Sequence, residues 1–152
     1  MTNINDKIES FELDTDQGKF YSKDHAGKNL VLFFFPKADT TGCTKEALSF
    51  SNLINEFEDL NTIVIGISKD PVEKQIKFKS KYDLKCILGS DVDINICSKF
   101  GVWVEKSMYG KKYMGIQRST FLINTEQKIQ HIWNKVKVPG HAEEVLEIVK
   151  KL

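Results

Sequence analysis

The sequence predicts an α/β fold in which a central mixed β-sheet is flanked by helices. Two observations favour this class. Strand-like and helix-like segments alternate through the first half of the chain, and a hairpin pattern followed by a helix closes the second half. The length of 152 residues and the hydrophobic fraction of 41% suit a single domain over residues 1–152, because a chain of this size can bury much of its apolar surface around one core.

The first strong strand signal is Asn29–Phe35, a continuous apolar run (NLVLFFF) that Pro36 closes. Such a run is typical of a central strand that is buried on both faces. After a short polar loop, apolar residues recur at steps of three and four, which predicts a helix opening at Cys43 with one face turned to the core: Ala47, Phe50, Ile54 and Phe57.

The rest of the chain contains a second buried strand, a hairpin and two more helices by the same criteria. Thr62–Ser68 (TIVIGIS) predicts a second buried strand, and a helix follows from Pro71 to about Tyr82, with proline where a first helical turn tolerates it. Ser119–Asn124 and Lys128–Trp133 flank a polar turn and predict an antiparallel hairpin. A closing amphipathic helix follows Pro139, marked by Ala142, Val145, Leu146, Val149 and Leu152.

This order of elements is the thioredoxin-like arrangement, a mixed sheet between layers of helices. Loops at the carboxyl ends of the strands in such sheets carry binding and catalytic groups. The sequence therefore predicts the functional site in residues 36–43.

The composition narrows the class of partner. The chain has 22 basic and 21 acidic side chains and a formal net charge of +1, so no field of one sign favours nucleic acid or an anionic membrane surface. The first residues, MTNINDKIESFELD, contain no apolar run of signal-peptide length, and no later stretch is long enough to cross a bilayer. We expect a cytoplasmic protein with a small, uncharged or modestly charged substrate.

The cysteines are three, Cys43, Cys86 and Cys97, and none stands in a CxxC pair. An odd number without that spacing argues against a disulfide framework and against a dithiol motif. The histidines do not stand at a spacing that completes a familiar metal site with a cysteine: His25, His131 and His141. We expect free thiols and no metal.

Cys43 is the candidate nucleophile. A thiol attacks as the thiolate, and a free cysteine with a pKa of ~8.5 is only slightly ionised at neutral pH. The unpaired N–H groups and the positive dipole end of the helix that Cys43 opens favour the anion.

Arg118 is the candidate cation beside that sulfur, because it is the only arginine among the 22 basic residues. A planar guanidinium can donate two hydrogen bonds to a thiolate and a bound oxygen atom together, which a lysine ammonium cannot imitate. The alternative is a surface arginine left by chance in a lysine-rich chain.

Three further side chains lie near Cys43 in the sequence. The Thr40 hydroxyl can donate to a bound oxygen, or it can simply cap the helix. Pro36 can end the strand and shield the sulfur from water, or it can serve only as a loop breaker. Glu46, three residues after Cys43, can orient the first turn, although a solvated glutamate is the default expectation.

The string PKADTTGCT, with Pro36, Thr40 and Cys43 in the order P-x-x-x-T-x-x-C, resembles the active-site signature of the peroxiredoxins. The run from Phe100 to Ile123 is similar in particular to their bacterioferritin comigratory protein branch, also called peroxiredoxin Q, and the likeness spans nearly the whole chain. The resemblance implies a thioredoxin fold, reduction of hydrogen peroxide and organic hydroperoxides without a metal or organic cofactor, and a catalytic set of Pro36, Thr40, Cys43 and Arg118.

The resemblance also implies a reaction path, in which the Cys43 thiolate attacks the peroxide O–O bond and becomes a sulfenic acid. Many members of this branch carry a resolving cysteine five residues later, where this chain has Leu48, and others carry it on the following helix, where Pro71–Tyr82 has none. Cys86, in a predicted short strand, and Cys97, in a predicted helix, are better interpreted as buried apolar fillers than as partners.

We therefore expect a one-cysteine cycle in which an external thiol, such as glutathione, glutaredoxin or thioredoxin, reduces the sulfenic acid. The resemblance implies a monomer or a weak dimer. Two other functions stay open on the residues alone: a redox sensor that turns over little peroxide, and a thiol transferase, which the missing second cysteine near Cys43 disfavours.

Overall fold

The computed structural model describes residues 3–152. Its strands are β1 (Glu12–Thr15), β2 (Gly18–Tyr21), β3 (Asn29–Phe34), β4 (Thr62–Ser68), β5 (Ile87–Ser90), β6 (Trp103–Met108), β7 (Lys111–Ile116), β8 (Ser119–Ile123) and β9 (Ile129–Trp133). Its helices are the 3-10 helix η1 (Ser22–His25) and α1 (Thr41–Asn52), α2 (Ile54–Asp59), α3 (Val72–Tyr82), α4 (Asn95–Lys99) and α5 (His141–Val149). Over the same residues, no helix has both the length and the apolar character needed to span a membrane.

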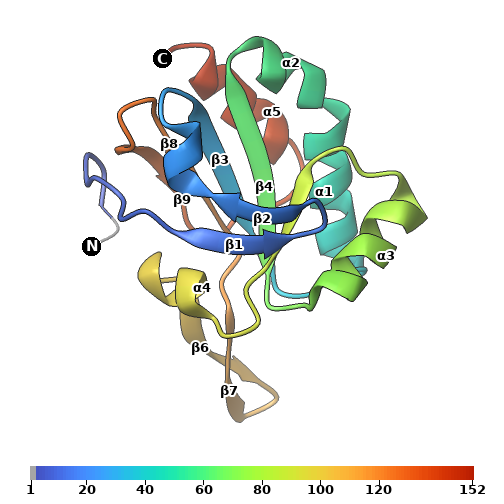
Figure 1. The fold of residues 1–152 in the computed structure, drawn as a ribbon. Helices are drawn as coiled ribbons and strands as arrows, with labels where there is room; N and C mark the ends of the chain where they lie inside the picture. The colour runs from blue at the N-terminus through green and yellow to red at the C-terminus, as the bar shows by residue number, and fades with distance from the viewer. Residues whose placement is uncertain (1–2) are drawn as a thin grey trace.

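The main sheet has seven strands in the order β2-β1-β5-β4-β3-β8-β9. The three central strands β3, β4 and β5 run parallel, whereas β8 and β9 on one side and β1 and β2 on the other pair antiparallel. The fold is thus thioredoxin-like, with the mixed central sheet that the sequence predicts. Strands β6 and β7 form a separate hairpin that projects from the rest of the molecule (Figure 1).

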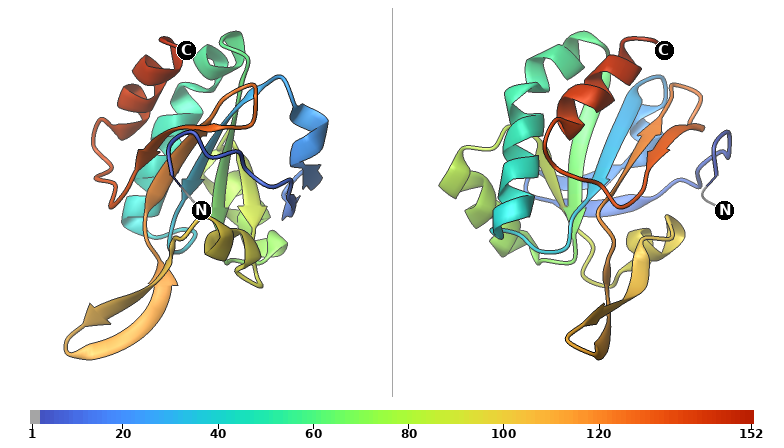
Figure 2. Two further views of the ribbon diagram at one scale, coloured as in Figure 1. Left: turned by 90° about the vertical axis from the view of Figure 1, so that its left-hand side faces the viewer. Right: turned by 180° about the vertical axis from the view of Figure 1, so that it is seen from behind.

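Both faces of the sheet are covered, and β3 shows why its sequence is a continuous apolar run. Val31 and Phe33 point into a core shared with α1, α2, α3 and α5, whereas Leu30, Leu32 and Phe34 point into a second core with β1, β2 and α4. Helices α1 and α5 lie together on one side of the sheet (Figure 2). Because side chains alternate along a strand, burial on both faces demands apolar residues at every position.

The predicted elements are confirmed with small shifts at their ends. Strand β4 has the predicted bounds, and the hairpin β8–β9 and the closing helix α5 lie where the pattern indicates. Pro71 is the residue before α3 and not its first helical residue. The first helix begins at Thr41, two residues before Cys43, and its apolar pattern belongs to two helices, because Leu53 interrupts it between α1 and α2.

The two hairpins β1–β2 and β6–β7 are absent from the sequence prediction. Strands β1 and β2 have four residues each, of which two are buried in β1 and one in β2, so their signal is weak. In β6–β7 most side chains are exposed and no apolar alternation marks the strands. The local signal that does exist is the turn, where Tyr109 and Gly110 both have positive φ, at 52° and 78°, as a type I′ turn requires.

Gly66 in β4 tests how closely the first core, around Val31 and Phe33, is packed. A Cβ added there would lie 2.4 Å from the end of the Phe33 ring, which is fully buried and stacks on Phe50 with ring centres 4.5 Å apart. We expect Gly66→Ala to lower the free energy of unfolding by about 1–3 kcal/mol, measured by urea denaturation, because the core has no free volume for the methyl group.

The matched control replaces Phe33, whose ring the added methyl group would contact, by the shorter side chain of leucine. In the double variant Phe33→Leu/Gly66→Ala, the loss should be smaller than the sum of the two single losses, since leucine no longer opposes the added carbon. Additive losses would contradict the proposed contact.

Candidate functional site

Helix α1 places Cys43 in its first turn. The first backbone hydrogen bond of the helix runs from the Thr44 N–H to the Thr40 carbonyl at 2.9 Å, so the N–H groups of Thr41, Gly42 and Cys43 have no acceptor within the helix. These groups and the helix dipole stabilise negative charge at this end. The cysteine side chain is almost enclosed, with 1% of its surface exposed.

Arg118 reaches this sulfur from the segment between β7 and β8. Its Nη2 lies 3.2 Å from Cys43 Sγ, and its Nη1 donates to Glu46 Oε1 at 2.7 Å. A Cβ at Gly42 would lie 3.3 Å from Nη2, so glycine leaves room for the guanidinium to approach the helix. The single arginine of the chain therefore contacts the candidate nucleophile directly.

Glu46 is buried, so the prediction of a solvated side chain at this position is wrong. Only 1% of it is exposed, and Arg118 is its ion-pair partner. Burial raises the pKa of this carboxyl to about 7, an effect that the Arg118 charge only partly opposes. Glu46 Oε2 is buried without a hydrogen-bond partner. The spacing of Cys43, Glu46 and Phe50 could have revealed this burial, because it places all three on the core-facing side of one helix.

The charges around Arg118 stabilise the guanidinium. Burial disfavours its charge, but Glu46 and Cys43 outweigh that effect and raise the pKa of Arg118. Burial, with a contribution from Arg118, lowers the pKa of nearby His141 to about 4, and its Nε2 lies 2.8 Å from the Thr120 hydroxyl. Near neutral pH the imidazole is thus uncharged, and the guanidinium remains the cation in contact with the sulfur.

Thr40 and Pro36 lie in the loop that joins β3 to α1. Thr40 is exposed and occupies the N-cap position of α1, but its hydroxyl donates to the Lys37 carbonyl at 2.8 Å and makes no capping bond to the helix. The alternative of plain side-chain capping is therefore not observed. Pro36 is half-buried and lies two residues after the end of β3.

The loop is attached to the neighbouring helix α3 and to the end of β4. The Ala38 N–H donates to Asp70 Oδ2 at 2.8 Å, and Asp39 accepts from the Tyr82 hydroxyl at 2.6 Å and from Lys81 Nζ at 2.9 Å. Asp39 has a φ of 62°, in the left-handed region that aspartate tolerates better than most residues. These contacts fix the path of the chain into the first turn of α1.

Cys86 and Cys97, the two other thiols, are buried like Cys43. Cys86 directly precedes β5 and Cys97 lies in α4, and both are fully buried, as the sequence predicts. Burial raises the pKa of Cys86 to about 12 and also raises that of Cys97, where nearby Asp91 adds to the effect. Thiols in such surroundings are poor nucleophiles.

Cys43 packs against the first core, and the polar groups near it are hydrogen-bond donors, namely the Arg118 guanidinium and the first N–H groups of α1. A guanidinium and free helix N–H groups bind oxygen atoms that carry or develop negative charge. Within residues 3–152, no cluster of three or more His, Cys, Asp or Glu side chains is arranged to hold a metal ion. The arrangement suits attack by sulfur on an oxygen atom held between the sulfur and the donors.

Comparison with known proteins agrees with this chemistry. Residues 4–132 match the model of the AhpC/TSA family. The chain is 46% identical over 144 residues to a putative peroxiredoxin bcp of Coxiella burnetii, covering 94% of this chain and 95% of that protein.

Two solved structures extend the likeness to the fold. A crystal structure of a PrxQ mutant from Xylella fastidiosa superimposes with a TM-score of 0.95 at 38% identity, covering 99% of this chain and 97% of that one. The bacterioferritin comigratory protein of Xanthomonas campestris, studied for its alkyl peroxide reduction activity, gives a TM-score of 0.89 at 38% identity, with coverage of 96% and 98%.

The buried Glu46 carboxyl predicts a pH dependence of stability. Its pKa is about 7 in the folded protein, above the ordinary value of 4.5, so its stabilising contribution is complete below pH 4.5 and is lost as the pH rises through about 7. From about pH 5 to pH 8, the free energy of unfolding of the wild type should fall by about 2 kcal/mol relative to Glu46→Gln.

Chemical denaturation of both proteins across this range measures the difference. The titration of His141 occurs in both and largely cancels, and glutamine keeps an acceptor for Arg118. Parallel pH profiles would contradict the assignment.

Proposed function

The chain belongs to the AhpC/TSA family and is a thiol-dependent peroxidase of its Bcp peroxiredoxin branch, and from this premise we propose that Cys43 is the sulfur that attacks the peroxide. The observation that carries the proposal is the distance of 3.2 Å between Arg118 Nη2 and Cys43 Sγ. The guanidinium is held there by Glu46 through its other nitrogen, at 2.7 Å. One nitrogen is thus fixed to the protein while the other faces the reacting atoms.

In the proposed first step, the Cys43 thiolate attacks one peroxide oxygen and the O–O bond breaks. Sulfur loses two electrons and becomes a sulfenic acid, and the second oxygen takes a proton and leaves as water or an alcohol. Arg118 and the free N–H groups at the start of α1 stabilise the negative charge that develops on the oxygens. The Arg118 donors are held by Glu46 and Cys43, so they are positioned before the reaction begins.

Thr40 and Pro36 complete the proposed site. The Thr40 hydroxyl now donates to the Lys37 carbonyl, so it would donate to a bound peroxide oxygen only after rotating about its side-chain bond. Pro36 has no N–H group and limits water near the sulfur through its ring.

The second half of the proposed cycle uses an external thiol. A first thiol attacks the sulfenic sulfur, an S–S bond forms and water leaves, and a second thiol then displaces the Cys43 thiolate. Support comes from the chain itself, since Leu48 and helix α3 offer no cysteine and the thiols of Cys86 and Cys97 are buried with raised pKa values. Glutathione, glutaredoxin and thioredoxin are the candidate reductants.

We expect hydrogen peroxide and organic hydroperoxides as substrates, which the alkyl peroxide reduction of the Xanthomonas campestris relative supports. Residues 1–152 act as one catalytic domain, as a monomer or a weak dimer. The three cysteines are free thiols, in keeping with a reducing compartment such as the cytoplasm.

The guanidinium geometry gives the sharpest test of the site. Arg118→Lys keeps the positive charge but cannot bind Glu46 and the reacting atoms at once, so the second-order rate constant with hydrogen peroxide should fall about a hundredfold. Stopped-flow kinetics under single-turnover conditions measures it, with Cys43→Ser as the inactive reference. An unchanged rate in the lysine variant would contradict the geometric argument.

The one-cysteine cycle predicts no internal disulfide. After one equivalent of peroxide, mass spectrometry should find Cys43 as sulfenic acid or as a mixed disulfide with added thiol, and not joined to Cys86 or Cys97. The variant Cys86→Ala/Cys97→Ala should keep steady-state turnover with an external thiol. An internal disulfide in high yield would refute the cycle.

A further inference from the structure

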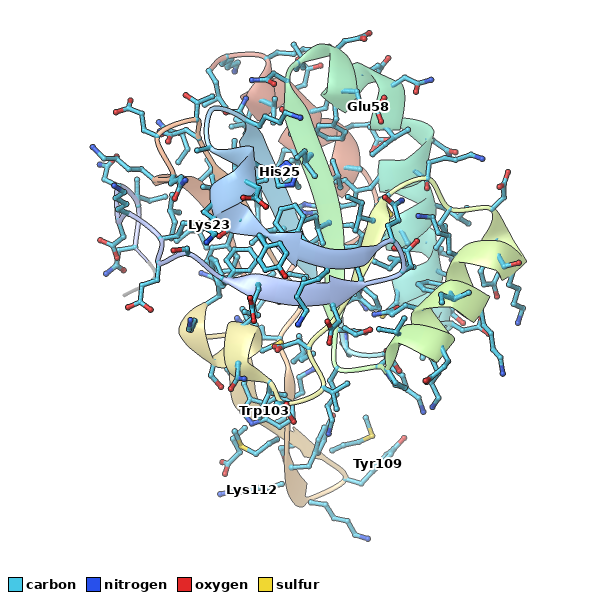
Figure 3. All side chains as sticks on the ribbon, in the orientation of Figure 1. Lys23, His25, Glu58, Trp103, Tyr109 and Lys112 are labelled. Atoms are coloured by element: carbon cyan, nitrogen blue, oxygen red, sulfur yellow. The ribbon has the colours of Figure 1, made fainter. Side chains whose placement is uncertain are left out.

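The β6–β7 hairpin projects beside the site and presents two different faces. Because paired residues of antiparallel strands share a face, the strand register defines both. The Lys106 face consists of Val104, Lys106, Met108, Lys111, Tyr113 and Gly115. The Trp103 face consists of Trp103, Glu105, Ser107, Lys112, Met114 and Ile116. Figure 3 shows Trp103 at the base of the hairpin and Lys112 farther out.

The base of the hairpin fixes the direction of each face. Trp103 and Ile116 pack with the second core, on the side of β1, β2 and α4, and Lys69 lies 5.5 Å from the centre of the Trp103 ring. The Lys106 face therefore points toward the opposite side of the sheet, where α1 carries Cys43.

Lys106 lies flat along its face because residue 115 is glycine. A Cβ at Gly115 would lie 3.2 Å from Lys106 Cδ and 3.5 Å from its Cε, so the lysine stem occupies the space that a side chain would take. Lys106 is half-buried, whereas its strand neighbours Glu105 and Ser107 are exposed. The missing side chain at Gly115 thus leaves space for the Lys106 stem on a hairpin whose residues are mostly exposed.

The ammonium of Lys106 lies in the field of the Cys43 site. Burial and the charge of Arg118 lower the pKa of Lys106, and Cys43 opposes them, so both groups are near enough to act on it. The Lys106 face carries a second lysine, Lys111, and no carboxylate. Glu105 belongs to the other face, with Lys112 Nζ at 4.0 Å. Positive charge on the Lys106 face is therefore uncompensated within the hairpin.

We propose that Lys106 determines which reductant the Cys43 site accepts, favouring a small thiol that carries a carboxylate over a neutral thiol. The inference rests on the external-thiol cycle proposed above. In the proposed site Arg118 binds the peroxide oxygens, whereas Lys106 lies on the exposed hairpin, where it can bind a larger thiol. A carboxylate paired with Lys106 holds the thiol beside the oxidised sulfur, and the S–S bond then forms with loss of water.

The first experiment measures the charge preference on Cys43 itself. Iodoacetate and iodoacetamide are of similar size and both alkylate sulfur with loss of iodide, but only iodoacetate is anionic. The ratio of their rate constants at Cys43, followed by mass spectrometry, should fall about threefold to tenfold in Lys106→Gln at low salt and recover in Lys106→Arg. Gly115→Val, which keeps every charge but fills the space under the lysine stem, should also lower the ratio.

Lys112→Gln is the matched control, because it removes the same charge from the opposite face of the same hairpin. It should leave the alkylation ratio and the peroxidase turnover unchanged. An equal fall of the ratio in Lys112→Gln and Lys106→Gln would overturn the proposal, because the effect would then come from net charge in general. A ratio that falls in neither variant would overturn it as well, because Lys106 would then have no effect on the charge preference.

The second experiment carries the inference to turnover. Steady-state peroxide reduction is compared with 3-mercaptopropionate and with 2-mercaptoethanol, and the ratio of their kcat/KM values should fall at least threefold in Lys106→Gln. An unchanged ratio overturns the reductant assignment. Failure of the external-thiol cycle looks different, since wild-type protein would then turn over with neither thiol while the alkylation ratio would still report on Lys106.

Discussion

One guanidinium joins the parts of this site. Arg118 binds Glu46 through one nitrogen and lies 3.2 Å from the Cys43 sulfur through the other. A carboxylate as deeply buried as Glu46 is costly without such a partner, and the guanidinium in turn needs the carboxylate to stay desolvated beside a thiol. The ion pair therefore ties the start of α1 to the segment before β8, and the sheet order makes this possible by placing β8 next to β3.

The sequence contains much of this arrangement where the signal is local. The continuous apolar runs of β3 and β4 and the spacing of three and four in α1 follow directly from burial, so their positions are predictable to within a few residues. Arg118 stands out as the only arginine in a lysine-rich chain, and the structure places it against the sulfur. A role that needs a guanidinium is thus visible in the composition, because the chain uses arginine at this one position and lysine at the others.

The parts that escaped prediction depend on contacts that the local pattern of residues does not show. Glu46 is charged, and nothing beside it in sequence shows that Arg118, 72 residues away, is its partner. The β6–β7 hairpin buries little of its own surface, so its pattern lacks the alternation that marks a strand. The position of Lys106 depends on Gly115 across that hairpin, a relation that appears only once the register is known.

Because the Cys43 sulfur is buried, the residues around it influence which reactants can reach it. Cys43 is 1% exposed, so in the proposed reaction only a small peroxide reaches Arg118 and the helix N–H groups, whereas a larger thiol must approach from the surface. Cys86 and Cys97 cannot compete for that role, since burial keeps both thiols protonated. In the proposed cycle the external thiol approaches Cys43 past the β6–β7 hairpin, so the charge of Lys106 becomes part of the specificity that we propose for the reductant.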